Sequence, residues 1–303
     1  MRLLLAAALA AAMPAAAPQQ AGTTFHVEAP LVNVFTSVTD KSGAPIGNLT
    51  KDDFEVTEDG RRQTIAVFER DTAAPLAMVL AVDVSGSTYK DFARERRAAA
   101  QFVKSVLRPQ DRADLLGFAD GTREVTGFTG DAGRIASGLH ELHPGTGGTA
   151  FYNTIAGAAE LLRTQRGRRV LLVISDGDNT VDNMTYQQAL DAAVRDQVMI
   201  YSLIDVPVAA SAGRDTGGEH AMIALSEQTG GRAYYTNQST LAQIFERVAE
   251  DLRTEYLLGY YPPKPEFAET ANAFRAITVT MRDPAKADYS LRYRPGYYAG
   301  GAR

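Results

Sequence analysis

The sequence predicts an α/β protein in which an open, doubly wound, mostly parallel sheet is inserted into a small β-sandwich made from both ends of the chain. In the middle of the chain, continuous apolar runs alternate with segments of helical periodicity, which is typical of a parallel sheet covered by helices on both faces. Both ends instead alternate apolar and polar residues, which is typical of half-buried strands. Each end is too short to bury a core alone, so we expect the two to pair.

Composition limits the classes of function. The chain has 303 residues, 45% of them hydrophobic and 22% charged, which is enough to bury a sizeable core. Its net charge of −5 argues against non-specific binding to nucleic acid or to an anionic membrane surface. It contains no cysteine and only four histidines, which excludes disulfide frameworks and most His-rich metal sites. Any metal ion must therefore be held by oxygen atoms.

Residues 1–21 are predicted to be a secretory signal peptide. Arg2 is followed by an apolar run from Leu3 to Met13, by the helix breaker Pro14 and by small residues at Ala15–Ala17. The run is much shorter than the roughly 20 apolar residues that a membrane anchor needs. No later stretch is long and apolar enough to span a bilayer, so we expect a secreted or periplasmic protein of the cell envelope, with no integral membrane segment.

The next segment, 22–74, is predicted to form the first half of the sandwich. Apolar and polar residues alternate from Val32 to Val38, and a second run begins at Phe54–Thr57. The turn Asp59-Gly60 follows, and the strand pattern resumes at Thr64–Phe68. Asp-Gly between two such runs is a strong hairpin signal.

The segment 75–254 is predicted to hold the doubly wound sheet. It starts with the buried strand Leu76–Val82 and an amphipathic helix over Lys90–Leu107, which ends before a proline. The other strands predicted here are Ala113–Ala119, Arg123–Phe128, Val170–Ser175, Val198–Asp205 and Arg232–Tyr235. The other helices are Asp131–Leu142, Phe151–Thr164, Tyr186–Asp196, Glu219–Thr229 and Thr240–Leu252.

The last segment, 255–303, returns to a strand pattern. Strands are predicted at Glu255–Tyr260, Ala276–Met281 and Tyr289–Tyr293, with a proline-rich break after the first of them. Roughly three strands from each end of the chain would then form the sandwich around the inserted domain.

In open α/β sheets, ligands bind at the carboxyl ends of the parallel strands. Three loops are predicted at this edge of the sheet. The first strand ends in Asp83-Val84-Ser85-Gly86-Ser87, and the strand at Val170 ends in Ser175-Asp176-Gly177. Between them, Gly145-Thr146-Gly147-Gly148-Thr149 precedes a helix. Five side chains in these loops offer oxygen ligands: Asp83, Ser85, Ser87, Thr149 and Asp176.

Carboxylates combined with neutral oxygens are the ligands that Mg²⁺ or Mn²⁺ prefers. Asp83, Ser85 and Ser87 occupy alternate positions, so a turning loop can aim all three inward. The two glycines before Thr149 allow a close approach of the second loop. A helix N-cap cluster is the alternative interpretation of the first loop, but it explains neither Thr149 nor Asp176.

This combination resembles the von Willebrand factor type A family, whose metal-ion-dependent adhesion site (MIDAS) joins D-x-S-x-S to a distant Thr and a distant Asp. The resemblance covers roughly Pro75–Leu252. Two flanking segments resemble secreted bacterial relatives of acidobacterial type. They are L-T-K-D-D-F-E-V-T-E-D-G at Leu49–Gly60 and Y-L-L-G-Y-Y-P at Tyr256–Pro262. The resemblance implies strand order 3-2-1-4-5-6 with one antiparallel edge strand. It also implies that Asp83, Ser85, Ser87, Thr149 and Asp176 bind Mg²⁺ or Mn²⁺. The implied function is binding of a protein ligand through an Asp or Glu of that ligand, without catalysis.

Two other functions stay open besides this adhesion or assembly module. One is a metal-dependent hydrolase or phosphatase, although aspartyl phosphatases on a similar sheet need a second Asp two residues after the nucleophile, where this chain has Ser85. The sequence also has no G-x-S-x-G elbow and no P-loop. The other is a metal-free envelope scaffold. We expect a protein that is not an enzyme.

Two further polar clusters are predicted to be structural. His140 and His143 lack further ligands nearby and are expected to lie at a solvated helix end. The basic run that contains Arg168 follows a helix, where cations suit the helix dipole.

Overall fold

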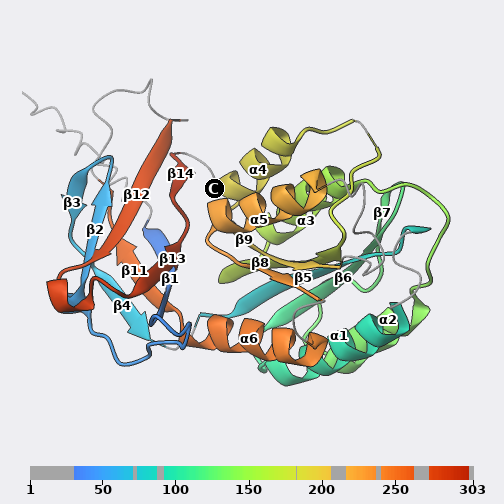
Figure 1. Cartoon of the computed structure of the whole chain (residues 1–303), viewed down its shortest axis with the longest axis horizontal. Helices are drawn as coiled ribbons and strands as arrows, with labels where there is room; N and C mark the ends of the chain where they lie inside the picture. Colours follow the sequence, from blue (N-terminus) through green and yellow to red (C-terminus); the bar gives the residue numbers. More distant parts are fainter. Residues whose placement is uncertain are drawn as a thin grey trace, which may run out of the picture.

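The computed structural model describes residues 31–70, 74–86, 92–181, 183–205, 216–236, 240–262 and 273–299. The predicted signal peptide and Ser87 lie outside these ranges. Figure 1 shows a β-sandwich beside an α/β domain, with the sandwich at the left of the view. No helix within the described ranges is both long and apolar enough to cross a membrane.

The α/β domain is built on a six-stranded sheet in the order β10-β9-β8-β5-β6-β7. All neighbouring strands are parallel except β6 and β7, which are antiparallel. Counted along the domain, this is the order 3-2-1-4-5-6 with one antiparallel edge strand, as predicted. The strands are β5 (Leu76–Asp83), β6 (Arg112–Phe118), β7 (Thr122–Glu124), β8 (Arg168–Ser175), β9 (Val198–Ile204) and β10 (Ala233–Tyr235).

Helices cover both faces of this sheet, as the continuous apolar strands predict. One face packs against α1, α2 and α6, and the opposite face against α3, α4 and α5 (Figure 1). The helices are α1 (Phe92–Val106), α2 (Ala132–Glu141), α3 (Phe151–Arg163), α4 (Tyr186–Arg195), α5 (Gly217–Thr229) and α6 (Leu241–Thr254). Polar side chains start several of them: Asp131 accepts from two backbone N–H groups of α2, and Thr240 forms a capping box on α6.

The sandwich consists of two antiparallel sheets, β13-β1-β11-β4 and β14-β12-β2-β3. Each sheet combines strands from both ends of the chain, which confirms that the α/β domain is inserted between them. Strands from the front are β1 (Val32–Thr39), β2 (Phe54–Glu58), β3 (Arg61–Gln63) and β4 (Val67–Arg70). Strands from the back are β11 (Tyr256–Tyr260), β12 (Phe274–Met281), β13 (Ser290–Tyr293) and β14 (Gly296–Tyr298). Short 3-10 turns lie at Lys51–Asp53 and Pro284–Lys286.

Two details of the sandwich differ from the prediction. Each end supplies four strands in the described residues, not three, because the short strands β3 at the front and β14 at the back were not predicted. The predicted strand Thr64–Phe68 is also wrong, because β3 ends before it and β4, starting at Val67, belongs to the other sheet. The crossing is fixed by Ile65, which is buried in the sandwich core, and by the backbone of Ala66, which donates to Gly259 at 2.7 Å.

The junction between the two parts is shorter than predicted. Helix α6 runs past Leu252 to Thr254, so only Glu255 separates it from β11. The Glu255 carboxylate forms a buried ion pair of 2.6 Å with Arg168 at the start of β8. The role of Arg168 is structural, as predicted, but it comes from this buried ion pair and not from a helix dipole. The sandwich lies against the amino ends of the parallel strands, so their carboxyl ends lie at the opposite edge of the sheet.

Candidate metal site

Asp83, the last residue of β5, is the most buried of the four predicted ligands that the structure describes, with only 1% of its surface exposed. Its Oδ1 accepts the backbone N–H of Ser85 at 2.8 Å, and its Oδ2 accepts the hydroxyl of Ser175 at 2.6 Å. These hydrogen bonds fix the carboxylate at the carboxyl edge of the sheet and turn the chain directly after the strand.

The surroundings of this carboxylate disfavour an unbalanced charge. Burial raises the pKa of Asp83, hydrogen bonds from Ser175 and Ser85 counter part of the rise, and the negative charge of Asp176 adds to it. A cation held beside Asp83 would offset both the burial and the repulsion.

Thr149 lies in the loop before α3 and is 3% exposed. Its N–H donates to the hydroxyl of Thr180 at 2.7 Å, and its carbonyl accepts the N–H of Thr180 at 2.9 Å. The same loop reaches the Asp83 loop, because the N–H of Gly145 donates to the carbonyl of Val84 at 2.6 Å. The Thr149 loop is therefore held against the chain segments that follow β5 and β8.

Asp120, which follows β6 after Ala119, also holds the Thr149 loop in place. Its carboxylate accepts the backbone N–H of Gly148. A Cβ atom at Gly147 would clash with this carboxylate, and one at Gly148 would clash with the hydroxyl of Thr180. These contacts give the physical reason for two consecutive glycines before Thr149. The role of Asp120 was not predicted from the sequence, because Asp120-Gly121 is also a common turn pair.

Asp176 follows β8 directly and is partly exposed, and its Oδ1 accepts the N–H of Asp178 at 3.2 Å. Its neighbour Ser175 is buried and connects three segments. The hydroxyl of Ser175 donates to Asp83 and accepts the N–H of Gly177 at 3.0 Å, and its carbonyl accepts the N–H of Asp205 at 2.8 Å. Ser175 was not predicted as a site residue, although its place before Asp176 at a strand end was a signal for it.

Four of the five predicted ligands can therefore be placed: Asp83, Ser85, Thr149 and Asp176 lie in three loops joined by hydrogen bonds at one edge of the sheet. Ser87 lies outside the described residues. Within the described ranges no three Asp, Glu or His side chains gather closely enough to hold a metal ion by themselves, so a site here depends on neutral hydroxyls. Carboxylate and hydroxyl oxygens are a donor set that fits Mg²⁺ or Mn²⁺. His140 and His143, at the end of α2, are exposed as predicted.

Residues 78–179 match the family model of the von Willebrand factor type A domain. A structure of proximal thread matrix protein 1 from the mussel byssus, with a zinc-occupied MIDAS motif, is 15% identical with a TM-score of 0.52, and the match covers 65% of this chain and 50% of that chain. The structure of BatB from Bacteroides thetaiotaomicron is 19% identical with a TM-score of 0.48. The match covers 58% of this chain and 97% of that chain. A structure of von Willebrand factor type A from Catenulispora acidiphila is 15% identical with a TM-score of 0.48. The match covers 74% of this chain and 50% of that chain. No curated protein matches the sequence.

Proposed function

We propose that this chain is a metal-dependent protein-binding module for adhesion or assembly. Mg²⁺ or Mn²⁺ would be held by Asp83, Ser85, Ser87, Thr149 and Asp176, the last directly or through water. The observation that carries the proposal is the buried Asp83 carboxylate at the carboxyl edge of the sheet, whose pKa is raised by burial and by the negative charge of Asp176.

The donor set suits capture of an acidic partner. Three of the five ligands are neutral hydroxyls, and Mg²⁺ takes about six oxygens, so one position stays open for an oxygen from outside. A bound ion would supply positive charge at this edge, and an Asp or Glu of a protein partner is the side chain that such a charge attracts. The zinc-occupied MIDAS motif of the mussel protein supports a divalent ion at this place in the fold.

We propose binding without turnover. Asp83 accepts hydrogen bonds on both carboxylate oxygens, which suits a ligand held in place better than a nucleophile. The position two residues later, where an aspartyl phosphatase needs its second carboxylate, is occupied by the buried Ser85. On the strength of the predicted signal peptide, we place the module in the cell envelope or outside the cell.

Calorimetric titration with Mg²⁺ and Mn²⁺ tests the proposal in the whole chain and in Asp83→Asn. Asp114→Asn is the matched control, because Asp114 is also fully buried with a raised pKa on the neighbouring strand β6, but before the strand's end. We expect binding in the wild type and in the control, and an affinity at least about tenfold weaker in Asp83→Asn. Equal affinity in both variants would contradict the site, and no binding in the wild type would favour the metal-free scaffold.

A second measurement tests the partner. The immobilised protein should retain a protein from envelope extract with Mg²⁺ present, and release it with EDTA. Asp83→Asn should retain none. Retention that is indifferent to EDTA would contradict a metal-bridged partner.

A further inference from the structure

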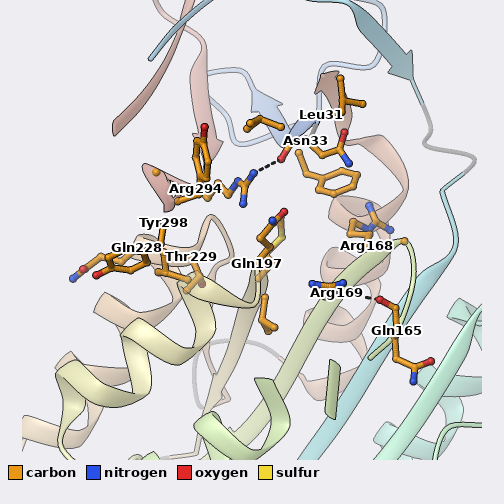
Figure 2. A pocket seen from close by; sticks show the side chains of 18 of the residues that line it. Leu31, Asn33, Gln165, Arg168, Arg169, Gln197, Gln228, Thr229, Arg294 and Tyr298 are labelled. Carbon is orange, nitrogen blue, oxygen red and sulfur yellow. Dashed lines mark hydrogen bonds between the residues drawn. The ribbon is translucent and has the colours of Figure 1, made fainter. Parts of the chain in front are cut away.

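A cavity of about 350 Å³ lies between the sandwich and the amino ends of β8 and β9, across the sheet from the metal loops (Figure 2). Asn33 and Phe35 of β1 form one wall, Arg168 and Arg169 of β8 another, and Arg294, between β13 and β14, a third. Its volume is within the range of sites for small organic ligands.

The cavity is lined by cationic side chains without acidic ones. Four of the lining residues are arginines, and none is Asp or Glu. Three of the four charges are accounted for. Arg168 pairs with Glu255, Arg169 donates to the backbone carbonyls of Gln165 and Asp196 at 3.1 and 2.8 Å, and Arg166 is exposed to solvent.

Arg294 is the exception. Its Nη2 donates to the backbone carbonyl of Asn33 at 2.8 Å, and its guanidinium lies over the ring of Tyr297, 5.5 Å from the centroid. Its Nε and Nη1 are shielded from solvent and have no hydrogen-bond partner, and no carboxylate in the described ranges lies within ion-pair distance of it. Burial lowers the pKa of Arg294 to about 10. A buried charge of this kind is costly unless a counter-charge accompanies it.

Buried polar atoms without a hydrogen-bond partner occur in the wall of this cavity. Three buried side-chain nitrogens of the cavity wall have no hydrogen-bond partner in the described ranges: Nε of Arg168, and Nε and Nη1 of Arg294. Buried polar atoms are usually hydrogen-bonded, so these arginine nitrogens are donors that a ligand in the cavity could use.

We propose that the cavity binds a small organic carboxylate, whose negative end pairs with Arg294 and whose apolar body lies against Leu31, Phe35, Val194 and Met199. Arg294 is a single guanidinium without a counter-charge beside apolar walls, and it suits one carboxylate better than a free phosphate, which carries more charge and needs more donors. Protein atoms cover the two unpartnered nitrogens, so binding requires the guanidinium to swing toward the cavity. This site is separate from the proposed metal site.

Calorimetric titration of the full chain with benzoate and hexanoate tests the site, with benzamide and hexanamide as their neutral counterparts. EDTA is present throughout, so that no carboxylate binds through a metal ion and the result does not depend on the proposed function. We expect one of the carboxylates to bind at least about tenfold more tightly than its amide. Equal binding of acid and amide, or no binding of either, would overturn the proposal. Tighter binding of inorganic phosphate than of benzoate would overturn the carboxylate assignment.

Variants locate the binding. Arg294→Gln should lose the preference for the carboxylate, whereas Arg61→Gln, which removes an exposed arginine of β3 outside the cavity, should keep it. Asn33→Asp provides a second variant if Arg294→Gln fails to fold. It places a negative charge on the cavity wall and should weaken benzoate binding about tenfold. Unchanged affinity in either cavity variant would overturn the proposal.

Discussion

Replacing Asp114 with Asn is expected to stabilise the protein at neutral pH. Asp114 lies on β6 with 0% of its surface exposed, and its Oδ1 accepts the hydroxyl of Thr126 at 3.2 Å. Burial and the negative charge of Glu124 raise the pKa of Asp114 from 3.8 to about 6. The folded protein therefore holds the Asp114 proton more tightly than the unfolded chain does.

The sign and size of the effect follow from this difference. The protonated side chain stabilises the folded state below pH 3.8, and this contribution is lost as the pH rises through about 6. Each pKa unit corresponds to about 1.4 kcal/mol, so the full shift corresponds to roughly 3 kcal/mol. Because Glu124 is exposed and solvent screens its charge, we expect about 1–2 kcal/mol. Asn carries no charge, and its side-chain oxygen can still accept from Thr126.

Urea unfolding with EDTA present measures this free energy at about pH 4 and about pH 8. We expect Asp114→Asn to exceed the wild type in unfolding free energy by about 1–2 kcal/mol at the higher pH and to match it at the lower pH. A difference that is the same at both pH values would refute the reasoning, as would a variant less stable at about pH 8.

The other predictions concern the domain junction and the Thr149 loop. Arg168→Met should lower the unfolding free energy by about 3–5 kcal/mol, because it leaves the Glu255 charge buried and unpaired. Adding Glu255→Leu should recover most of that loss, and urea unfolding of both variants checks this. Asp120→Ala removes the acceptor of the Gly148 N–H, so Mn²⁺ affinity in calorimetry should fall about tenfold while the melting temperature stays nearly unchanged. An unchanged affinity would show that Asp120 does not position Thr149.

The central sheet could be predicted because its information is local. Each buried strand is a continuous apolar run, and each helix carries its own periodicity and often its own cap, such as Asp131. The predicted ligands could also be found from the local sequence, because Asp83 is the last residue of β5 and Asp176 directly follows β8. Topology then brings the loops together, because the carboxyl ends of parallel strands share an edge.

The features that were missed depend on contacts between distant parts of the chain. The run Thr64–Phe68 has the same alternation whether it stays in a hairpin or crosses to the other sheet, and Gly259 from the far end of the chain decides this. Ser175 reaches Asp83 across 92 residues, and Arg168 reaches Glu255 across 87. No pattern within a single segment contains these pairings.

Anomalous X-ray diffraction from crystals grown with Mn²⁺ tests the central claim most directly, because it locates the ion without assuming its ligands. We expect a peak at the carboxyl edge of the sheet, in contact with oxygens of Asp83, Ser85 and Thr149. A protein that binds Mn²⁺ in solution but shows its peak elsewhere, with none beside Asp83, would contradict the account.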